Sequence, residues 1–277
     1  MRLSDAAQHQ AAYQTFGEFA SVPFWPGSLT ILAAPPGAGK TSWALRMVAD
    51  AAAQGFPAVI GCYEHTEEEL ADRLRRQAAG IVFGPHPEDE NDRFDPRVEN
   101  LLAQAGNAVL LHLNGAMDTI RVFEDRLLVD EGFSSGQPAL IVLDYLQRAP
   151  VVNRMGQAIT DNTRAGEAAV ALKQMALRHG WAVVAISALE KGAFIPLEQL
   201  QANPEVALAT LLGDERLPYE ADRVFVVYKE QELSCGCCHR LIRLTAKNRL
   251  GSTGAQQMVF WGQRTLPLLK EEASSHG

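Results

Sequence analysis

Short apolar runs alternate with amphipathic segments over most of the chain. The apolar runs predict buried strands at residues 29–33, 58–63, 109–113, 139–143, 181–187 and 224–228. The segments between most of them repeat their apolar positions with helical spacing, at residues 42–54, 67–79, 120–129 and 164–179. Continuous apolar strands that alternate with helices are typical of a mostly parallel, twisted sheet with helices on both faces. We therefore predict an α/β fold.

The two ends of the chain depart from this alternation. Runs at residues 241–245 and 257–261 flank a Gly-Ser-Thr-Gly turn and predict an antiparallel hairpin at the C-terminal edge of the sheet. Residues 1–22 are mostly polar and predict an N-terminal arm or linker, which leaves residues 23–277 as one domain.

Three segments are the least regular, at residues 84–96, 147–162 and 191–220. The first is acidic and proline-rich, so it predicts a surface loop. The other two follow strand ends, where open α/β sheets form their ligand crevice.

Composition narrows the class of protein. The 277 residues are 47% hydrophobic, which supports a packed core. No apolar run approaches the roughly 20 residues that span a bilayer, and the N-terminus lacks the apolar stretch of a signal peptide. Four cysteines without an export signal predict free thiols in a reducing cytoplasm. A net charge of −8 argues against a basic nucleic-acid binder, although a ring can be acidic outside and basic only where a strand passes.

A glycine-rich loop joins the first predicted strand to the first predicted helix and ends in Gly39-Lys40-Thr41. Successive backbone N–H groups and the positive end of a helix form a nest for phosphate. Lys40 can reach the β- and γ-phosphates of ATP, and the Thr41 hydroxyl can ligate Mg²⁺. Ala34 replaces the first glycine of the strict motif, which is tolerated if that position needs no positive φ. The predicted nucleotide-binding residues are Pro36, Gly37, Ala38, Gly39, Lys40, Thr41 and Ser42.

Two predicted strands end in carboxylates. Asp144 follows the run at 139–143, and beside a phosphate loop such an aspartate orients the Mg²⁺ shell; elsewhere it would as often cap a turn. Glu64 follows the second strand, just before Thr66, which forms a capping box with Glu69. Glu64 is placed to hold and deprotonate an attacking water. The alternative is an anion that supports the helix N-terminus.

The order of these elements resembles the RecA-like ATPase core of DnaB-type replicative helicases, in a stand-alone form. The matching pieces are Gly39-Lys40-Thr41, the strand into Glu64 with residues 66–70, residues 141–147, residues 183–189, Tyr219-Glu-Ala-Asp222 and Lys247-Asn-Arg249 before Gly251. The run Asp144-Tyr-Leu-Gln147 is the most specific, because a general phosphate-loop ATPase need not have it. The resemblance covers roughly residues 22–265 and implies a RecA-like P-loop ATPase. Residues 247–251 also resemble a motif of RadA-type recombination ATPases.

The resemblance implies roles for single residues. It assigns phosphate binding, Mg²⁺ binding, water activation and metal support to Lys40, Thr41, Glu64 and Asp144 respectively. Lys247 and Arg249 would reach the γ-phosphate held by a neighbouring subunit, which requires a head-to-tail homo-oligomer, a hexameric ring in this family. Residues 240–254 hold Arg240, Arg243, Lys247 and Arg249 and no acid. A solvated basic hairpin is the alternative.

Two features depart from the family pattern. The family has a glutamine after the strand-terminal serine, where it senses the γ-phosphate, but here Ser187 is followed by Ala188. Alanine cannot hydrogen-bond phosphate, so the coupling of hydrolysis to loop movement is in question. Replicative helicases also carry an N-terminal domain that recruits primase, whereas about two dozen residues precede this core. We expect a stand-alone motor whose arm docks on the adjacent subunit.

Contacts with single-stranded DNA are expected in the two loops that line the central channel in this family. The loop after Asp144 offers Arg148 and Arg154 against one acid. Residues 190–222 hold two basic and seven acidic residues, a net charge of −5, which is a poor phosphate surface. The candidate DNA-binding residues are Arg148, Arg154 and Lys191.

Cys235-Gly-Cys-Cys-His239 lies between two predicted strands. A structural zinc site needs four ligands, usually as two separated pairs, and one short turn would cramp Cys235, Cys237, Cys238 and His239. We favour a hairpin tip with free thiols; a zinc knuckle or a site shared between subunits is the alternative. Cys62 falls inside a strand and is expected in the core.

The leading hypothesis is a ring-forming ATPase that translocates on single-stranded DNA and unwinds duplex in replication. Ala188, the short N-terminal arm and the acidic second loop favour an alternative, a nucleotide-switched helicase loader or assembly factor that binds a protein partner. A RadA-like recombination accessory ATPase without processive unwinding is the third hypothesis.

Overall fold

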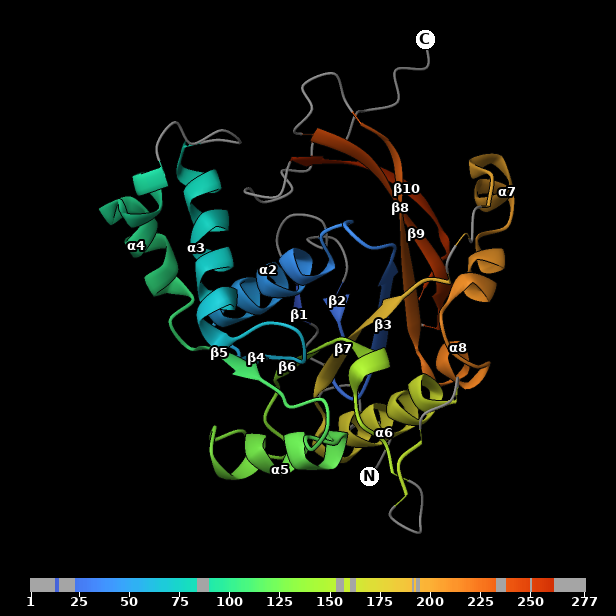
Figure 1. Cartoon of the computed structure of the whole chain (residues 1–277), viewed down its shortest axis with the longest axis horizontal. Coiled ribbons are helices and arrows are strands. Elements are labelled where there is room, and N and C mark those ends of the chain that lie inside the picture. The colour runs from blue at the N-terminus through green and yellow to red at the C-terminus, as the bar shows by residue number, and fades with distance from the viewer. Residues whose placement is uncertain are drawn as a thin grey trace, which may run out of the picture.

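A computed structural model describes residues 13–14, 23–83, 90–152, 157–159, 163–190, 192, 195–232, 238–249 and 251–261. An eight-stranded sheet forms its centre, in the order β10-β9-β8-β3-β7-β6-β4-β5 (Figure 1). The strands are β3 (Leu29–Ala34), β4 (Ala58–Cys62), β5 (Ala108–His112), β6 (Leu140–Asp144), β7 (Ala182–Ala188), β8 (Arg223–Glu232), β9 (Cys238–Asn248) and β10 (Gly254–Trp261). The six strands from β5 to β8 pair in parallel, and β9 and β10 are antiparallel.

Helices cover both faces of this sheet (Figure 1). They are α2 (Lys40–Ala53), α3 (Glu67–Phe83), α4 (Pro96–Gln104), α5 (Ile120–Val129), α6 (Arg164–His179), α7 (Leu197–Ala202) and α8 (Arg216–Glu220). The predicted α/β class, with an antiparallel C-terminal hairpin, is confirmed. Among the described residues, no helix combines the length and apolar character that crossing a bilayer requires.

Alternate residues of each central strand pack into different layers of the core. Leu32 packs with Leu45 of α2 in one layer, and Ile31 packs with Phe123 of α5 and Leu172 of α6 in the other. Strand side chains point alternately to the two faces, so a strand covered by helices on both sides is apolar throughout. All six residues of β3 are buried, which places the loop that follows it on a rigid support.

Some elements differ from the sequence prediction. The acidic segment expected to be a surface loop includes a 3₁₀ helix, Glu90–Phe94, whose Arg93 forms an ion pair with Asp72 of α3. Helix α4 follows and was not predicted; the Asp95 side chain accepts a hydrogen bond from the Arg97 N–H, and a proline stands in the first turn.

The described parts of the other two irregular segments also contain helical elements. Helices α7 and α8 and the 3₁₀ helix η4 (Pro204–Thr210) lie within residues 191–220, and the 3₁₀ helix η3 (Leu146–Arg148) overlaps the start of residues 147–162. Of the predicted arm, the structure describes the two-residue strand β1 (Tyr13–Gln14), which pairs with β2 (Pro23–Phe24).

Candidate active site

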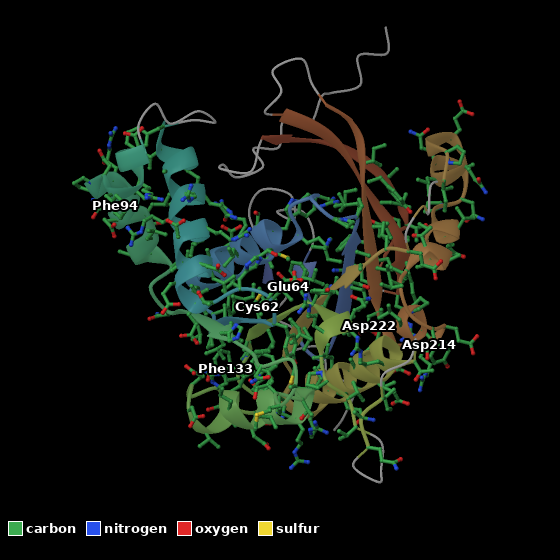
Figure 2. All side chains as sticks on the ribbon, in the orientation of Figure 1. Cys62, Glu64, Phe94, Phe133, Asp214 and Asp222 are labelled. Carbon is green, nitrogen blue, oxygen red and sulfur yellow. The ribbon has the colours of Figure 1, made fainter. Side chains whose placement is uncertain are left out.

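A cavity of about 740 Å³ opens at the carboxyl ends of β3, β4 and β6. It receives residues from the glycine-rich loop, the exits of β4, β6 and β7, and one face of α3. Its lining residues are Pro36, Gly37, Gly39, Lys40, Thr41, Ser42, Glu64, Glu69, Asp72, Arg73, Arg76, Asp144, Tyr145 and Ala188. Figure 2 labels Cys62 within β4 and Glu64 just beyond it. The parallel sheet thus brings the predicted loop and both predicted carboxylates to one site.

The loop between β3 and α2 has the geometry of a phosphate nest. Gly37 and Gly39 have φ values of 78° and 77°, which a side chain would strain. Ala34 belongs to β3, and positive φ values occur only at glycines among the described residues, so its replacement of the motif glycine costs no strain. All predicted loop residues line the cavity except Ala38, which is 5% exposed and packs in the core. Helix α2 begins at Lys40, with no acid in its first turn to neutralise its positive end.

Lys40 lies in the cavity with its ammonium group held by backbone. Its Nζ donates hydrogen bonds to the carbonyl oxygens of Ala34 and Pro35, both at 3.0 Å. Burial lowers the pKa of Lys40, and the nearby carboxylates of Asp144 and Glu64 oppose that shift. A partly buried ammonium group bonded only to neutral carbonyls is a ready partner for an anion.

Thr41 and Asp144 form the polar centre of the site. The Thr41 hydroxyl donates to Asp144 Oδ2 at 2.6 Å. Asp144 is 2% exposed; burial raises its pKa, and the Thr41 hydrogen bond partly offsets that effect. A hydroxyl and a carboxylate oxygen are the hard donors that Mg²⁺ prefers, so these two residues fit a nucleotide-bound magnesium ion.

Glu64 stands at the exit of β4, where the chain turns into α3. The predicted capping box is present: Glu69 N–H donates to Thr66 Oγ1 at 3.3 Å, and Thr66 N–H donates to Glu69 Oε2 at 3.0 Å. This cap fixes the first turn of α3 and leaves Glu64 outside the helix, on the cavity wall. Glu64 Oε1 lies 3.4 Å from Arg148 Nη2.

One wall of the cavity was missed by sequence reasoning. Glu69, Arg73 and Arg76 of α3 line it at positions i, i+4 and i+7, on one helix face. Arg76 pairs with Asp72 at 2.7 Å, whereas the Arg73 side chain is exposed at the cavity. The signal in the sequence was the repeat of charged residues one and two turns after the capping box.

Ala188, where the family pattern has glutamine, also lines the cavity. The side chain of Gln147 forms hydrogen bonds with groups next to Ala188 and with its backbone N–H. Gln147 Nε2 donates to Ser187 Oγ at 2.8 Å and to the Leu212 carbonyl at 2.7 Å, and its Oε1 accepts from the Ala188 N–H at 3.1 Å. Gln147 therefore links the segment that follows β6 to the end of β7 by hydrogen bonds.

Lys247 and Arg249 lie at the opposite end of the sheet. Asn248, between them, pairs with Arg223 at the start of β8, and Arg223 pairs with Thr30 near the start of β3. The phosphate loop follows the other end of β3. The structure therefore does not bring Lys247 or Arg249 to the cavity of their own chain.

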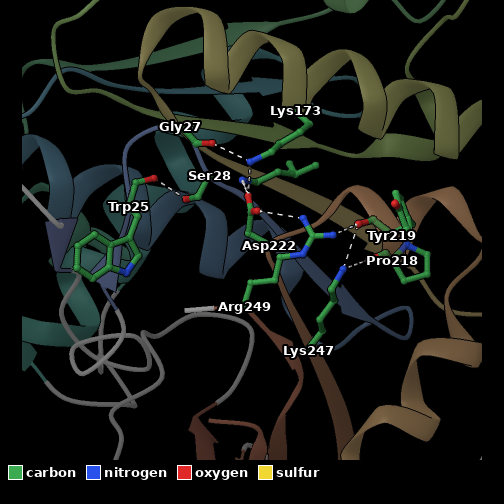
Figure 3. Close-up of polar contacts among 10 residues, drawn as sticks. Trp25, Gly27, Ser28, Lys173, Pro218, Tyr219, Asp222, Lys247 and Arg249 are labelled. Atoms are coloured by element: carbon green, nitrogen blue, oxygen red, sulfur yellow. Dashed lines mark hydrogen bonds and ion pairs between the residues drawn. The ribbon is translucent and has the colours of Figure 1, made fainter. Parts of the chain in front are cut away.

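Asp222 organises the polar contacts around Arg249 (Figure 3). Its Oδ2 accepts from the Leu29 N–H at 2.8 Å and from Lys173 Nζ at 2.6 Å, and its Oδ1 lies 3.5 Å from Arg249 Nη1. Arg249 Nη2 and Lys247 Nζ both donate to the Tyr219 carbonyl, at 2.8 and 3.1 Å. Both basic side chains are held at this end of the sheet.

The structure describes some of the remaining predicted residues and not others. Arg148 ends η3, and its side chain is 54% exposed. Arg154, Lys191, Cys235 and Cys237 lie outside the described residues, as do the side chains of Cys238 and His239. Within the part of the chain that the structure describes, no three His, Cys, Asp or Glu residues are grouped to hold a metal ion. Cys62 is buried as predicted, and burial raises the pKa of its thiol to about 12.

Comparison with known proteins gives one family. Residues 18–266 match the model of the DnaB-like helicase C terminal domain. A solved DnaB-like replicative helicase, studied with its interactions with primase, superposes with a TM-score of 0.68 at 19% identity over 89% of this chain. The solved ATPase domain of a second protein superposes with a TM-score of 0.63 at 19% identity, covering 83% of this chain and 80% of that one. The chain spans 58% of the replicative helicase, and at such identity the two structures show a shared fold.

Proposed function

Because the chain belongs to the family of DnaB-like helicase C-terminal domains, we propose that it is an ATP hydrolase that works as the motor of a helicase ring. The observation that carries this proposal is the hydrogen bond between Thr41 and Asp144 under the phosphate loop, with Glu64 on the wall of the same cavity. These residues would supply a magnesium ligand, a metal-orienting carboxylate and a base for water, which are three of the parts that phosphoryl transfer to water uses.

The chemistry follows from the residues around the cavity. The loop amides and the start of α2 bind the phosphates, and Lys40 exchanges its two carbonyl partners for phosphate oxygens. Thr41 and Asp144 would hold a magnesium ion, and that ion would supply positive charge to offset the negative charge that develops on the phosphates. Glu64 accepts a hydrogen bond from the attacking water and takes its proton as the water oxygen bonds to the γ-phosphorus. The bond from that phosphorus to the β–γ bridging oxygen breaks in the same step, and ADP leaves with the electron pair of that bond.

A ring explains the separation of Lys247 and Arg249 from their own cavity. In a head-to-tail assembly, the cavity of one subunit faces the opposite end of the next, so these two residues reach the γ-phosphate of a neighbour. We propose a homo-hexamer of this kind, with single-stranded DNA in the channel and ATP hydrolysis coupled to translocation and duplex unwinding. Supply of Arg249 in trans would make hydrolysis depend on assembly.

One observation favours a second function. Ala188 lies at the cavity where the family pattern places a glutamine that senses γ-phosphate, and an alanine offers only its backbone there. A ring that binds ATP without this sensor suits a nucleotide-switched loader or assembly factor, or a recombination accessory ATPase, better than a processive motor.

The deciding experiment compares ATP hydrolysis with and without a single-stranded oligonucleotide at low salt, together with strand displacement on a forked duplex. A motor shows hydrolysis that DNA stimulates, and displacement that requires ATP. Hydrolysis that is indifferent to DNA, with no displacement in any nucleotide state, would reject the motor. Capture of a replication or recombination protein that depends on ATP but not on DNA would then support the loader.

Arg73→Ala is expected to weaken nucleotide binding without slowing the chemical step. Arg73 is exposed on the cavity wall and offers a charge-assisted hydrogen bond to a phosphate oxygen, worth about 1.5 kcal/mol, so we expect KM for ATP to rise about tenfold at constant kcat. Steady-state kinetics measure both quantities. Arg75→Ala is the matched control, because Arg75 is on the same helix but pairs with Glu99 of α4. An equal rise in KM for both variants would contradict the prediction.

A further inference from the structure

We propose that Arg148 is a positioning residue that holds Glu64 away from catalysis until the phosphate backbone of single-stranded DNA takes over its guanidinium group. This inference rests on the proposed function, in which Glu64 activates water. The observation behind it is the ion pair between Arg148 Nη2 and Glu64 Oε1, at 3.4 Å. It joins a residue on the cavity wall to one in the loop expected to follow DNA.

The backbone that carries Arg148 is anchored on several sides. Leu146 is fully buried, and the side chain of Gln147 makes the three hydrogen bonds to the end of β7 and to Leu212 described above. Arg164 of α6 donates to the Gln147 carbonyl. With η3 fixed in this way, a change of partner at Arg148 needs only rotation of its side chain, not movement of the loop.

The side chain of Arg148 is free to exchange. It is 54% exposed, and its second contact, from Nε to the Tyr145 hydroxyl, is long at 3.5 Å. An exposed ion pair is weak and is screened by salt. A phosphate diester offers the same guanidinium charged oxygens in bidentate geometry, which is a stronger partner than one carboxylate oxygen at 3.4 Å. DNA therefore competes directly with Glu64.

Release of Glu64 changes what its carboxylate can reach. The ion pair engages Oε1 of Glu64 with the guanidinium group of Arg148 in η3. A general base must lie within hydrogen-bond reach of the proton that it takes, so a carboxylate held elsewhere is badly placed for catalysis. Once Arg148 turns to DNA, both carboxylate oxygens of Glu64 are available to the attacking water. DNA stimulation of hydrolysis then follows from one exchange of ionic partners.

The test measures kcat and KM for ATP with and without a single-stranded oligothymidylate, for wild type, Arg148→Gln and Arg148→Lys. Arg148→Gln is expected to raise the DNA-free kcat about tenfold, a fraction of what a well-placed general base contributes, and to reduce DNA stimulation to almost nothing. KM is expected to stay constant. Arg148→Lys keeps a positive charge and should retain most of the DNA dependence. Arg121→Gln, which changes an exposed side chain on α5, should match wild type.

The outcomes separate this inference from the proposed function. A DNA-free kcat of Arg148→Gln equal to that of wild type, with stimulation lost, would overturn the inference and leave Arg148 as a simple DNA contact. Full stimulation of Arg148→Gln would also overturn it. A wild type that DNA does not stimulate would overturn the proposed motor and this inference together. A Glu64→Gln variant that hydrolyses ATP as fast as wild type would show that Glu64 is not the base, and would overturn this inference while leaving ATP hydrolysis itself in place.

Discussion

Replacement of Glu64 by glutamine is expected to slow ATP hydrolysis by a factor of about 10²–10⁴, the range that a general base contributes. Glutamine keeps the size of the side chain and its place on the cavity wall but cannot take a proton from water. Nucleotide binding should change little, because the loop, Lys40 and the Thr41–Asp144 pair are untouched. Single-turnover hydrolysis and the binding of a fluorescent ATP analogue measure the two quantities separately.

Glu68→Gln is the matched control for this prediction. Glu68 stands four residues away, in the first turn of α3, and is exposed without being among the cavity-lining residues. Its replacement should leave hydrolysis within about twofold of wild type, as expected for a surface substitution. If Glu64→Gln hydrolysed ATP as fast as Glu68→Gln, Glu64 would be only an anion near the start of α3, and another base would have to be sought.

Arg249→Ala is expected to lower kcat by a factor of about 10³ or more, as loss of an arginine that stabilises transition-state charge does. The structure places Arg249 at the far end of the sheet from the cavity, held by Asp222 and the Tyr219 carbonyl. In the proposed ring, its effect passes through a neighbouring subunit. Steady-state hydrolysis at a protein concentration that maintains the oligomer measures the loss. Arg121→Ala, an exposed arginine on α5, should retain the wild-type rate.

Mixed assemblies distinguish action in trans from a structural defect. Glu64→Gln subunits lack the base but keep Arg249, and Arg249→Ala subunits keep the base. Where the two meet in the right order, one complete site forms, so a mixture of two inactive proteins should recover hydrolysis. A mixture as inactive as its components would show that Arg249 does not serve a neighbour's site.

The core of the fold was predictable because its signals are local. The parallel strands β3, β4 and β6 are buried at every residue and so appear as apolar runs in the sequence. The capping box at Thr66 marked the start of α3 correctly. Helix α4 was missed although Val98, Leu101 and Leu102 stand at helical spacing, because a pattern of three apolar residues in nine is too short to stand out beside an acidic, proline-rich segment. Its marker in the sequence was the pair Asp95-Pro96, an N-cap residue followed by a proline in the first turn.

The cavity was predictable in its centre and not at its wall. Lys40 and Thr41 end a glycine-rich loop whose residue spacing itself indicates phosphate binding, and Asp144 ends an apolar strand. Because parallel strands have their carboxyl ends at the same edge of the sheet, these residues could be expected at one site. The arginines of α3 and the ion pair at Arg148 depend on how helices dock, which residue spacing alone does not determine. The same holds for Asp222, which contacts Leu29 across 193 residues of chain.

Strand β3 connects the phosphate loop to the region around Arg249. Its first residue, Leu29, is bonded to Asp222 beside Arg249, and the loop that cradles phosphate follows its last residue. Six extended residues span about 20 Å at ~3.3 Å each, and this strand is bonded to a partner along both edges. Such a strand is rigid because both of its edges are hydrogen-bonded. In a ring, a displacement of the phosphate loop at one nucleotide site would be transmitted along β3 to the region around Arg249, and so to the next site, without a hinge inside the subunit.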